Sequence, residues 1–392
     1  MMSSDDCIEV ASPSDATELN DLYFSVYGSG YPLKKGIEYH ATREALEDRD
    51  HHLWLLAREP EGGRIIGSCI FELEPELKIG KVSGVVVHRN HRGRGISRAL
   101  IGRGTNDLLN EKGLNSLYTT TRTVSVAPQM MFLKNGYIPL GLFPNAHKLH
   151  QFETVTLMGT FSKEALSQRV RVQKMPLEIS KLAELVNETL DMRAYNPKTI
   201  TLGKAQDFED DEVHVRQEFE FIFAPEFVRK CYRRRFRKYS ESGFYPFHEP
   251  NLLINFDRGD LEIYAYYNKK DRYCAIISGS KILRKTGLKF TDLLNAMKDY
   301  GISYVELLLR LDHCKSARYF LDAGFIPSAL YPSMKEESAG MYDFVLLTQT
   351  MEPLNFQGMR LHESFNPYVK LYTSHWIHQH LDALEVYHDI RS

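Results

Sequence analysis

The segment best suited to chemistry runs from Val85 to Leu100 and reads Val-Val-Val-His-Arg-Asn-His-Arg-Gly-Arg-Gly-Ile-Ser-Arg-Ala-Leu. The three valines predict the end of a strand, and Ser97 to Leu109 predicts a helix. Glycines in the turn between them let backbone N–H groups converge, and the helix N-terminus adds the positive end of its dipole. The turn therefore predicts a phosphate cradle, with Arg92, Arg94 and Arg98 supplying charge near its rim.

The elements that must position this turn predict an α/β domain. A helix is expected over Asp15–Tyr27, with Ser14 as its N-cap candidate. The other expected elements of this unit are strands at Leu53–Ala57, Ile65–Glu74, Ile79–His88, Leu114–Val124, Tyr137–Phe143 and Thr154–Phe161, and a helix at Ala127–Lys134. Together they predict a mixed, mostly antiparallel sheet flanked by helices (an α+β arrangement).

Part of this unit recurs later in the chain. Phe132–Asn145 and Phe320–Ser333 are identical at seven of 14 positions, at an offset of 188 residues. The same offset relates Gly113 to Gly301, which predicts a duplicated domain. The elements expected in the second copy are strands at Leu252–Asn255, Leu261–Tyr267, Tyr273–Ser278, Ser303–Leu309 and Phe344–Gln349, and helices at Lys289–Asp299 and Ser316–Asp322.

The repeat divides the chain into four predicted parts. They are a first domain at 1–162, a mainly helical insertion leading into the second domain at 163–250, the second copy at 251–352, and a C-terminal extension at 353–392. The extension is rich in aromatic residues and histidine, which favours packing across a domain over independent folding.

The phosphate turn and its flanking elements resemble a known superfamily. The order strand, Arg-x-x-Gly-x-Gly/Ala, helix, here Arg92 to Ser97, is similar to motif A of the Gcn5-related N-acetyltransferases (GNAT). The resemblance covers roughly Cys7 to Ser162. The Phe-Leu-x-x-Gly-Tyr element at 132–137 resembles the closing helix and strand of that family.

This resemblance implies acetyl-CoA as the acyl donor. Backbone groups of Val85, Val86 and Val87 would hold the pantetheine arm. The pyrophosphate would lie on the amides of Arg92, Gly93, Arg94, Gly95, Ile96, Ser97 and Arg98. Two positions depart from the family pattern: Ser97 stands where Gly or Ala is usual, and Phe132 stands where a tyrosine often donates a proton to the departing thiolate.

Catalytic candidates lie on the strands that face the expected thioester. A hairpin turn at Pro75–Lys78 places Glu72 opposite Lys81, and several relatives carry a catalytic Glu at the Lys81 position. Glu72 is therefore the first candidate for the general base, although a surface Glu72–Lys81 pair explains it as well. Tyr118 and Ser125 are candidates to relay or donate a proton, and Tyr118 also suits a wall position.

Candidates for contact with the acceptor come from the first helix and the loop after it. Tyr23, Tyr27 and Tyr31 belong to the region that faces the acceptor in the GNAT fold. Packing alone explains these tyrosines equally well.

The second copy lacks the glycines of the first. At the 188-residue offset, Arg92–Ser97 falls on Ser280–Lys285, which reads Ser-Lys-Ile-Leu-Arg-Lys. Without glycine the backbone loses its freedom for close approach. This predicts a degenerate copy that shapes the substrate cleft and stabilises the first domain.

The composition of the chain argues against several other classes of protein. The 49 Lys+Arg and 51 Asp+Glu residues give a net charge of −2, which argues against a nucleic-acid partner. No apolar run reaches the roughly 20 residues of a membrane span. The five scattered cysteines have no CxxC spacing, so we expect a cytoplasmic protein with neither disulfides nor a zinc site.

Two other segments invite a functional interpretation. The basic run Arg229–Lys238 carries Val228, Tyr232 and Phe236 on one helical stripe, which predicts a solvated basic face. An acidic acceptor, RNA or the acidic run Asp207–Glu212 are its alternative partners. Histidines at Trp376–His380 lack a carboxylate at helical spacing, so no metal is expected there.

The favoured reading is an acetyl-CoA-dependent N-acetyltransferase that acts on the primary amine of a small molecule by direct attack in a ternary complex. Two alternatives stay open. Aminoacyl or peptidyl transfer from aminoacyl-tRNA would suit tandem domains and the basic helix, and a non-catalytic CoA sensor or scaffold would suit Phe132. The sequence also leaves a homodimer open.

Overall fold

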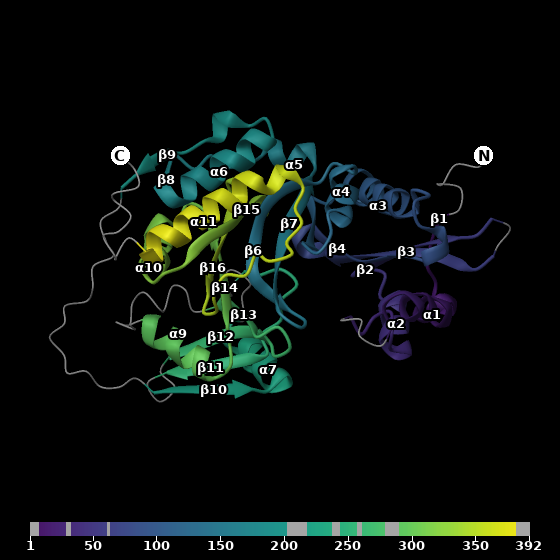
Figure 1. Cartoon of the computed structure of the whole chain (residues 1–392), viewed down its shortest axis with the longest axis horizontal. Helices are drawn as coiled ribbons and strands as arrows, with labels where there is room; N and C mark the ends of the chain where they lie inside the picture. The colour runs from purple at the N-terminus through teal and green to yellow at the C-terminus, as the bar shows by residue number, and fades with distance from the viewer. Residues whose placement is uncertain are drawn as a thin grey trace.

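The structure is a computed structural model that describes residues 8–28, 33–60, 63–201, 218–236, 244–256, 261–278 and 290–381. Within these ranges one sheet of 14 strands runs through the molecule, in the order β1-β2-β3-β4-β5-β7-β6-β15-β16-β14-β13-β12-β11-β10 (Figure 1). One apolar core of buried side chains extends through both halves of this sheet.

The first half contains the strands β1 (Ile8–Val10), β2 (His52–Arg58), β3 (Ile65–Glu74), β4 (Ile79–Val87), β5 (Ser116–Arg122), β6 (Ile138–Lys148) and β7 (Phe152–Phe161). Its helices are α1 (Ala16–Tyr27), α2 (Tyr39–Glu47), α3 (Ile96–Asn106) and α4 (Ala127–Leu133). Figure 1 shows α1 and α2 on one side of these strands and α3 and α4 on the other.

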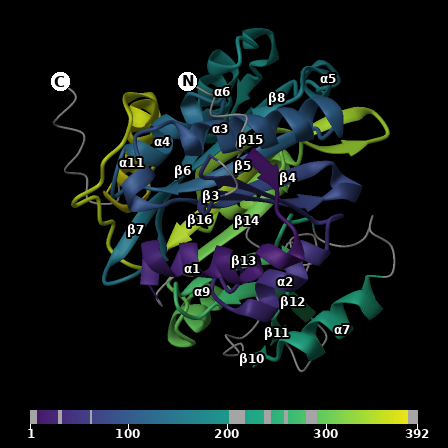
Figure 2. The same cartoon turned by 90° about the vertical axis from the view of Figure 1, so that its right-hand side faces the viewer.

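A connecting region then adds α5 (Lys163–Ser167), β8 (Lys174–Pro176), α6 (Leu177–Thr189) and β9 (Lys198–Ile200). The second half contains the strands β10 (Phe219–Phe223), β11 (Leu252–Phe256), β12 (Leu261–Asn268), β13 (Tyr273–Ser278), β14 (Tyr304–Arg310), β15 (Ile326–Glu337) and β16 (Gly340–Thr350). Its helices are α7 (Pro225–Arg235), α9 (Phe290–Asp299), α10 (Cys314–Asp322) and α11 (Asn366–Leu381). Figures 1 and 2 both place β10, β11 and α7 together at one end of the molecule.

The second half repeats the strand order of the first. Read from either edge toward the centre, each half has four consecutive strands, then a parallel neighbour, then two strands in swapped order. The parallel pairs are β4–β5 and β13–β14. The halves join where β6 pairs antiparallel with β15 through Gly141 and Ala329, which are 188 positions apart. The two halves are thus related by an approximate two-fold arrangement about this seam.

Backbone details recur at the same offset. Positive φ values occur at Gly136 (79°) and Gly324 (98°), and again at Asn145 (63°) and Ser333 (47°). The β6–β7 ladder shifts register between Pro139 and Gly141, and the β15–β16 ladder shifts between Pro327 and Ala329. A left-handed backbone is uncommon outside glycine, so the shared values at Asn145 and Ser333 mark the same local turn in both halves.

Two glycines bring α3 close to the sheet and so fix the place of the phosphate turn. A Cβ at Gly104 would lie 2.2 Å from the Phe71 ring, and one at Gly67 would lie 2.7 Å from Ile96. These close approaches hold both ends of α3 against β3, and the first turn of α3 lies beside the end of β4.

The structure corrects the sequence-based elements at several places. Phe219–Phe223 lies in the region predicted to be mainly helical, but it forms β10 and pairs with β11 at the sheet edge. Its Phe-Glu-Phe-Ile-Phe sequence has the period of two that suits a strand, and Phe221 stacks on Tyr300 with ring centroids 4.5 Å apart. The short β1 and the helices α2 and α11 were also missed.

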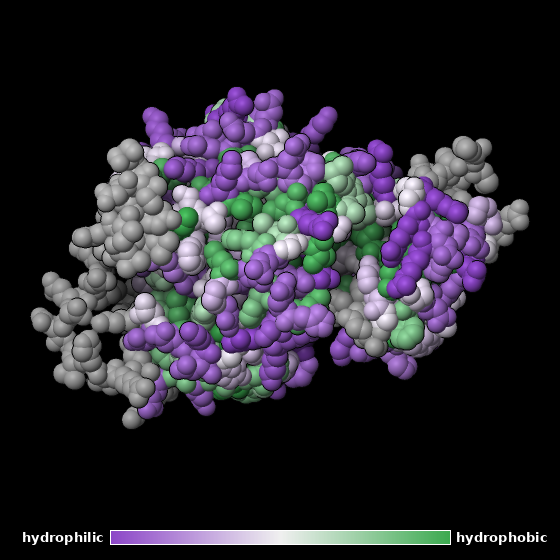
Figure 3. Space-filling model, in the orientation of Figure 1, coloured by the Kyte–Doolittle hydropathy of each residue, from purple (hydrophilic) through white to green (hydrophobic). Residues whose placement is uncertain are grey.

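The C-terminal helix α11 packs on both halves of the molecule, and its Gln379 Nε2 donates to the Leu321 carbonyl of the second half at 3.2 Å. The Tyr368 hydroxyl on α11 donates to the Pro139 carbonyl at 2.8 Å. Figure 3 shows hydrophilic side chains along the upper and lower borders of this face of the molecule, with apolar side chains gathered between them. Among the described residues, no helix combines the length and apolar character that a bilayer crossing requires.

Candidate active site

Strands β4 and β5 pair only briefly and then diverge. Their parallel register covers Ile79 to Lys81 against Ser116 to Tyr118. Beyond it, β4 bulges: its register with β3 shifts between Ser83 and Val86, and Gly84 adopts a φ of 58°. A Cβ at Gly84 would lie 2.7 Å from Ile70 and 2.9 Å from the Tyr23 hydroxyl, so this bulge needs glycine.

The divergence leaves one edge of Val85–Val87 without a strand neighbour. On the other edge, Val86 and Val87 pair with Ser68 and Gly67 of β3. The Val85 carbonyl accepts a hydrogen bond of 3.2 Å from the Tyr27 hydroxyl, and the Val87 carbonyl accepts one of 3.4 Å from Arg92 Nε. Backbone groups on the open edge can therefore bind an extended ligand.

The turn after β4 has the properties of an anion cradle. Gly93 and Gly95 adopt φ values of 77° and 82°, and a Cβ at either would meet nothing within 4 Å. Among the described residues, no backbone N–H from Arg92 to Arg98 donates to another backbone group outside α3, and the first N–H groups of a helix have no partner within it. Free amides, space above them and a helix N-terminus fit a diphosphate.

Charge around the cradle is positive. Arg92, Arg94 and Arg98 are exposed, and none of them forms an ion pair with an acidic side chain of the described residues. Ser97, the departure from the family pattern, is half-buried in the first turn of α3. The residues present thus suit the pyrophosphate of a nucleotide-linked donor.

A row of polar side chains crosses the sheet beside the divergence. Cross-strand pairing places His52 opposite Glu72, Glu72 opposite Lys81, and Lys81 opposite Tyr118. Alternation along strands puts paired residues on one face, so this polar row spans β2 to β5. The Glu72–Lys81 pairing follows the sequence-based prediction.

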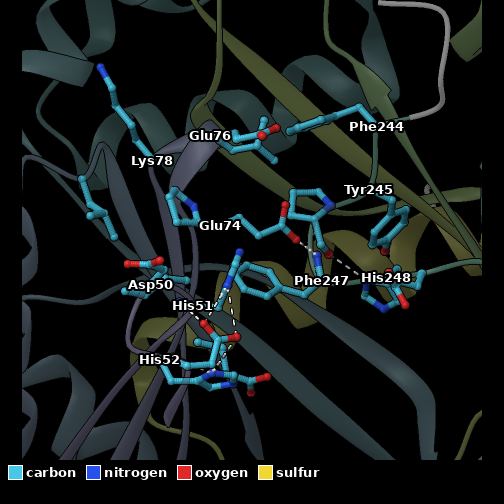
Figure 4. A pocket seen from close by; sticks show the side chains of 18 of the residues that line it. Asp50, His51, His52, Glu74, Glu76, Lys78, Phe244, Tyr245, Phe247 and His248 are labelled. Carbon is cyan, nitrogen blue, oxygen red and sulfur yellow. Dashed lines mark hydrogen bonds and ion pairs between the residues drawn. The ribbon is translucent and has the colours of Figure 1, made fainter. Parts of the chain in front are cut away.

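A cavity of about 1690 Å³ opens beside this row, and His52 and Glu72 of the row line it. The first half contributes Lys35, His52, Glu72 and Glu74 to its lining, and the second half contributes residues 244–250. Figure 4 shows Glu74 and Phe247 meeting across it, with His51 and His52 on the side of the first half.

Glu72 is held by three neighbours. Its Oε2 accepts from Lys35 Nζ at 2.8 Å, and its Oε1 accepts from Ser83 Oγ at 2.8 Å. Burial alone would raise the pKa of Glu72, but the charges of Lys81 and Lys35 and these hydrogen bonds outweigh it and leave the pKa below its usual range. Glu72 is therefore ionised at neutral pH, next to the bulge.

Tyr118 is buried between the two halves. Its ring makes edge contacts with Phe247 and Tyr331, with centroids 5.6 and 5.7 Å away. Burial, with Tyr331 and nearby carboxylates, raises the pKa of Tyr118 well above its usual range. The hydroxyl stays protonated at neutral pH, so Tyr118 does not act as a base, and its raised pKa also makes it a weaker acid than an ordinary tyrosine.

Other predicted residues take different places. Ser125 Oγ accepts from the Ala127 amide at 3.2 Å and so supports the start of α4. Tyr23 is fully buried and donates to the Gly84 carbonyl at 2.5 Å, so it holds the bulge and does not line the cavity. Tyr27 is 47% exposed and Tyr31 lies outside the described residues. Phe132 is 3% exposed and packs on Tyr137, with the two ring centroids 5.0 Å apart.

Sequence reasoning missed the segment 244–250 of the second half. The Phe247 amide donates to Glu74 Oε1, which ties this segment to β3. The run Phe-Tyr-Pro-Phe-His-Glu-Pro at these positions is unusually rich in aromatic residues and proline. That composition was the available signal that aromatic side chains of this segment line a cavity.

Below this segment lies a buried carboxyl group that the sequence analysis did not single out. Glu306 is 4% exposed and accepts hydrogen bonds from the hydroxyls of Tyr245, Tyr273 and Tyr304. Burial raises the pKa of Glu306, and the three hydroxyls offset part of this rise. The Tyr245 hydrogen bond thus ties residues 244–250 to Glu306 of β14.

The basic run on α7 is paired over much of its length. Arg229 bonds Glu226 and Glu249, Arg233 lies 3.3 Å from Glu249, and Arg235 bonds Glu262. Val228 is buried on the opposite face. The acidic run at 207–212 and the loop Ser280–Lys285 lie outside the described residues.

No group of three or more His, Cys, Asp or Glu side chains in the described ranges is arranged to hold a metal ion. At 376–380, the rings of Trp376 and His380 stack on each other at 4.5 Å.

Comparison with known proteins assigns the first half. Residues 16–137 match the model of the acetyltransferase (GNAT) family. The matched part of the chain holds both the cradle and the polar row. Comparison with curated proteins finds no match.

Solved structures of GNAT proteins resemble part of the chain. A GNAT-family acetyltransferase from Streptococcus pneumoniae is 22% identical, with a TM-score of 0.35, over 40% of this chain and 98% of that one. The ribosomal-protein-alanine N-acetyltransferase from Brucella melitensis is 19% identical, with a TM-score of 0.35, over 39% and 98%. A putative acetyltransferase from Salmonella typhimurium, solved with its cofactor acetyl-CoA, is 17% identical, with a TM-score of 0.36, over 40% and 94%.

Proposed function

We propose that the protein transfers an acetyl group from acetyl-CoA to the primary amine of a small molecule by direct attack in a ternary complex. The observation that carries this proposal is the row of unpaired amides from Arg92 to Arg98, which directly follows the free edge of β4. In the reaction, the amine nitrogen bonds to the carbonyl carbon and the carbon–sulfur bond breaks. One amine proton is lost and the CoA thiolate gains one.

The chain's own residues divide this work. The amides of Arg92–Arg98 hold the pyrophosphate, and the free edge of Val85–Val87 holds the pantetheine arm. Glu72 is ionised beside the bulge and accepts the proton of the amine, directly or through water. Tyr118 keeps its proton at neutral pH and supplies one to the thiolate, because Phe132 carries no polar atom.

The second half is proposed to be a degenerate GNAT-like domain that completes the acceptor site. Its repeated strand order and its positive φ values at the 188-residue offset support this relationship. Its contribution to the cavity includes residues of α7 and the segment 244–250, which packs on Tyr118 and Glu74. A cavity lined by both halves favours a small acceptor over a protein surface.

The alternatives draw less support. Transfer from aminoacyl-tRNA would use a free basic surface, but glutamates pair with Arg229, Arg233 and Arg235 of α7. A non-catalytic sensor would need no ionised carboxylate at the divergence, yet Glu72 is held there by Lys35 and Ser83. A cytoplasmic location is also proposed, and the free thiols of the described cysteines agree with it.

The test is thiol release from acetyl-CoA across a panel of small primary amines, followed with a thiol reagent. We expect release with at least one amine and tight CoA binding by calorimetry. Tight CoA binding without thiol release for any amine would instead support a non-catalytic CoA sensor. Release only with aminoacyl-tRNA as donor would support the other alternative.

A further inference from the structure

A lysine of this chain occupies a site built for a primary ammonium group. Lys35 Nζ lies 2.8 Å from Glu72 Oε2 and 2.8 Å from His52 Nε2. The Lys35 side chain is 26% exposed and that of Glu72 is 20% exposed. Its neighbour Lys34 is 78% exposed and lies 3.8 Å from Glu38 on the surface. Lys35 alone of the two points into the cavity lining.

His52 presents a lone pair to this amine. Its Nδ1 contacts the Asp48 carbonyl at 3.3 Å, and a carbonyl only accepts, so Nδ1 carries the proton. Burial, together with the positive charge of Lys35, lowers the pKa of His52, so the ring is neutral at neutral pH. The Lys35 nitrogen therefore faces a carboxylate and an unprotonated imidazole nitrogen, both able to accept its protons.

The site also borders the place where the acyl group would be presented. Glu72 bonds Ser83 through its second oxygen, and Ser83 immediately precedes the Gly84 bulge where β4 has left β5. Two hydrogen bonds thus connect the Lys35 amine to the divergence of the strands. An acceptor amine needs these same features: a proton acceptor, a cavity and proximity to the donor strand.

We propose that Lys35 holds the place of the acceptor's amine, and that its Nζ accepts the acetyl group when no external amine is present. The inference rests on the proposed transferase function and specifies its acceptor as a primary amine on an alkyl chain. External amines compete with Lys35 for Glu72 and His52. Acetylation removes the charge of Lys35, so Lys35 no longer competes with external amines for Glu72 and His52.

The step balances without any further reactant. The Lys35 ammonium gives one proton to His52 Nε2 or to Glu72, and the free amine attacks the thioester carbonyl carbon. A carbon–nitrogen bond forms, the carbon–sulfur bond breaks, and its electron pair leaves on sulfur. The products are Nε-acetyl-Lys35, CoA thiol and one proton released to solvent.

The primary test incubates the full chain with isotope-labelled acetyl-CoA and maps acetylated lysines by mass spectrometry. We expect the labelled fraction of Lys35 to be well above that of Lys34. The first-order rate constant for Lys35 labelling should be independent of protein concentration. Chemical acetylation by the thioester would instead favour Lys34, which is the more exposed amine and so the matched control. The proposal is overturned if the labelled fraction of Lys34 equals or exceeds that of Lys35. It is also overturned if the rate constant for Lys35 labelling rises with protein concentration.

A second test separates this inference from the proposed function. Because an occupied site weakens the apparent affinity for a competitor, Lys35→Gln should lower the KM for alkyl amines about tenfold, whereas Lys34→Gln should leave it unchanged. Amine acetylation by the wild type, with Lys35 unlabelled and the Lys35→Gln KM unaltered, overturns the inference alone. If CoA binds but neither Lys35 nor any amine is acetylated, both proposals fail.

Discussion

Glu72 is the residue on which the two interpretations of the polar row diverge. A carboxylate that merely balances Lys81 and Lys35 contributes to stability, whereas a proton acceptor contributes to rate. Its position beside Ser83 and the bulge favours the second role, while its lowered pKa makes it a weak base. The two roles predict different losses when the charge is removed.

We expect Glu72→Gln to lower kcat by about 10²- to 10⁴-fold, the usual contribution of a general base. Glu76→Gln is the matched control, because Glu76 lines the same cavity but is exposed. The measurement is kcat by thiol release, with thermal unfolding of each variant. Equal kcat values for the two variants would make Glu72 a structural ion-pair partner only.

The pKa of Glu72 also sets the sign of a stability effect. Its folded-state pKa lies below the ordinary Glu value, so ionised Glu72 stabilises the fold above that value. That contribution disappears as the pH falls through the folded-state pKa, and Glu72→Gln should not show this loss.

Tyr118 and Phe132 test where the thiolate obtains its proton. Tyr118→Phe removes a hydroxyl that is protonated beside the divergence, so we expect slower thiol release with unchanged CoA affinity. Phe132→Tyr places a hydroxyl in the core against Tyr137, so we expect a stability loss of about 1–3 kcal/mol and no gain in rate. Faster release in Phe132→Tyr would show that its hydroxyl reaches the thiolate.

At this scale the sequence predicted pairs that local geometry dictates and missed those that depend on tertiary contact. The Glu72–Lys81 register follows from the turn at Pro75–Lys78. Lys35 precedes α2, and its approach to Glu72 depends on how that helix packs, which periodicity cannot show. The same holds for Phe247, which reaches Glu74 from 173 residues away.

At the scale of elements, the cradle depends on a turn whose glycines serve no packing purpose. Gly93 and Gly95 face open space, so their missing side chains leave room for a ligand above them. Their positive φ values also make the turn itself depend on glycine.

We expect Gly95→Asp to weaken CoA binding by about 10- to 100-fold, through a carboxylate that repels the pyrophosphate and a Cβ that blocks the amides. Gly113→Asp is the matched control. Gly113 has a φ of 69° and open space around it, and it lies beyond the far end of α3. The comparison uses calorimetric Kd values, and equal values for both variants would remove the cradle from the proposal.

Elements with a strong local pattern were predicted within a few residues of their place. The strand Ile79–His88 corresponds to β4, and the helix Ser97–Leu109 corresponds to α3 with the π-helical turn after it. The edge strand β1 was missed because three residues carry too little pattern, and β10 was missed because its alternation spans only five residues inside a region predicted to be mainly helical. Their strand identity comes from pairing with a neighbour.

At the scale of the whole molecule, the 188-residue repeat was visible because seven identities cluster in 14 positions. The seam between β6 and β15 was not, since a pairing of two edge strands leaves no signal in either one. The proposed acceptor cavity is lined by residues of both halves, which this seam joins.

Glu306 couples this junction to pH. Its folded-state pKa is raised by burial, so the folded state holds its proton more tightly than the unfolded chain. Stability therefore falls as the pH rises from the ordinary Glu pKa of about 4.3 through the folded-state value. We expect Glu306→Gln to show a smaller decline over this range in chemical denaturation. An equal decline would mean that Glu306 is ionised in the folded state.

Hydrogen bonds from other segments hold Asn145 and Ser333, the two residues with positive φ at equivalent positions of the two halves. Asn145 Nδ2 donates to Thr350 Oγ1 at 3.2 Å and to the Pro353 carbonyl at 3.0 Å. The Ser333 amide donates to Asp343 Oδ1 at 2.9 Å, and Arg169 holds the same carboxylate through bonds of 2.6 to 2.9 Å. The Arg169 and Asp343 side chains are only 1% and 3% exposed.

A buried ion pair of this kind costs most when one member is lost, because the other charge stays buried without a partner. We expect Arg169→Met to destabilise the protein by about 3–5 kcal/mol. Arg193→Met is the control, since Arg193 is 73% exposed beside Glu188 and should change stability by less than about 1 kcal/mol. Adding Asp343→Leu to Arg169→Met should restore part of the loss in chemical denaturation. If the double variant is no more stable than Arg169→Met alone, Asp343 stabilises the fold mainly through the Ser333 amide, and the turn at the seam depends on that bond.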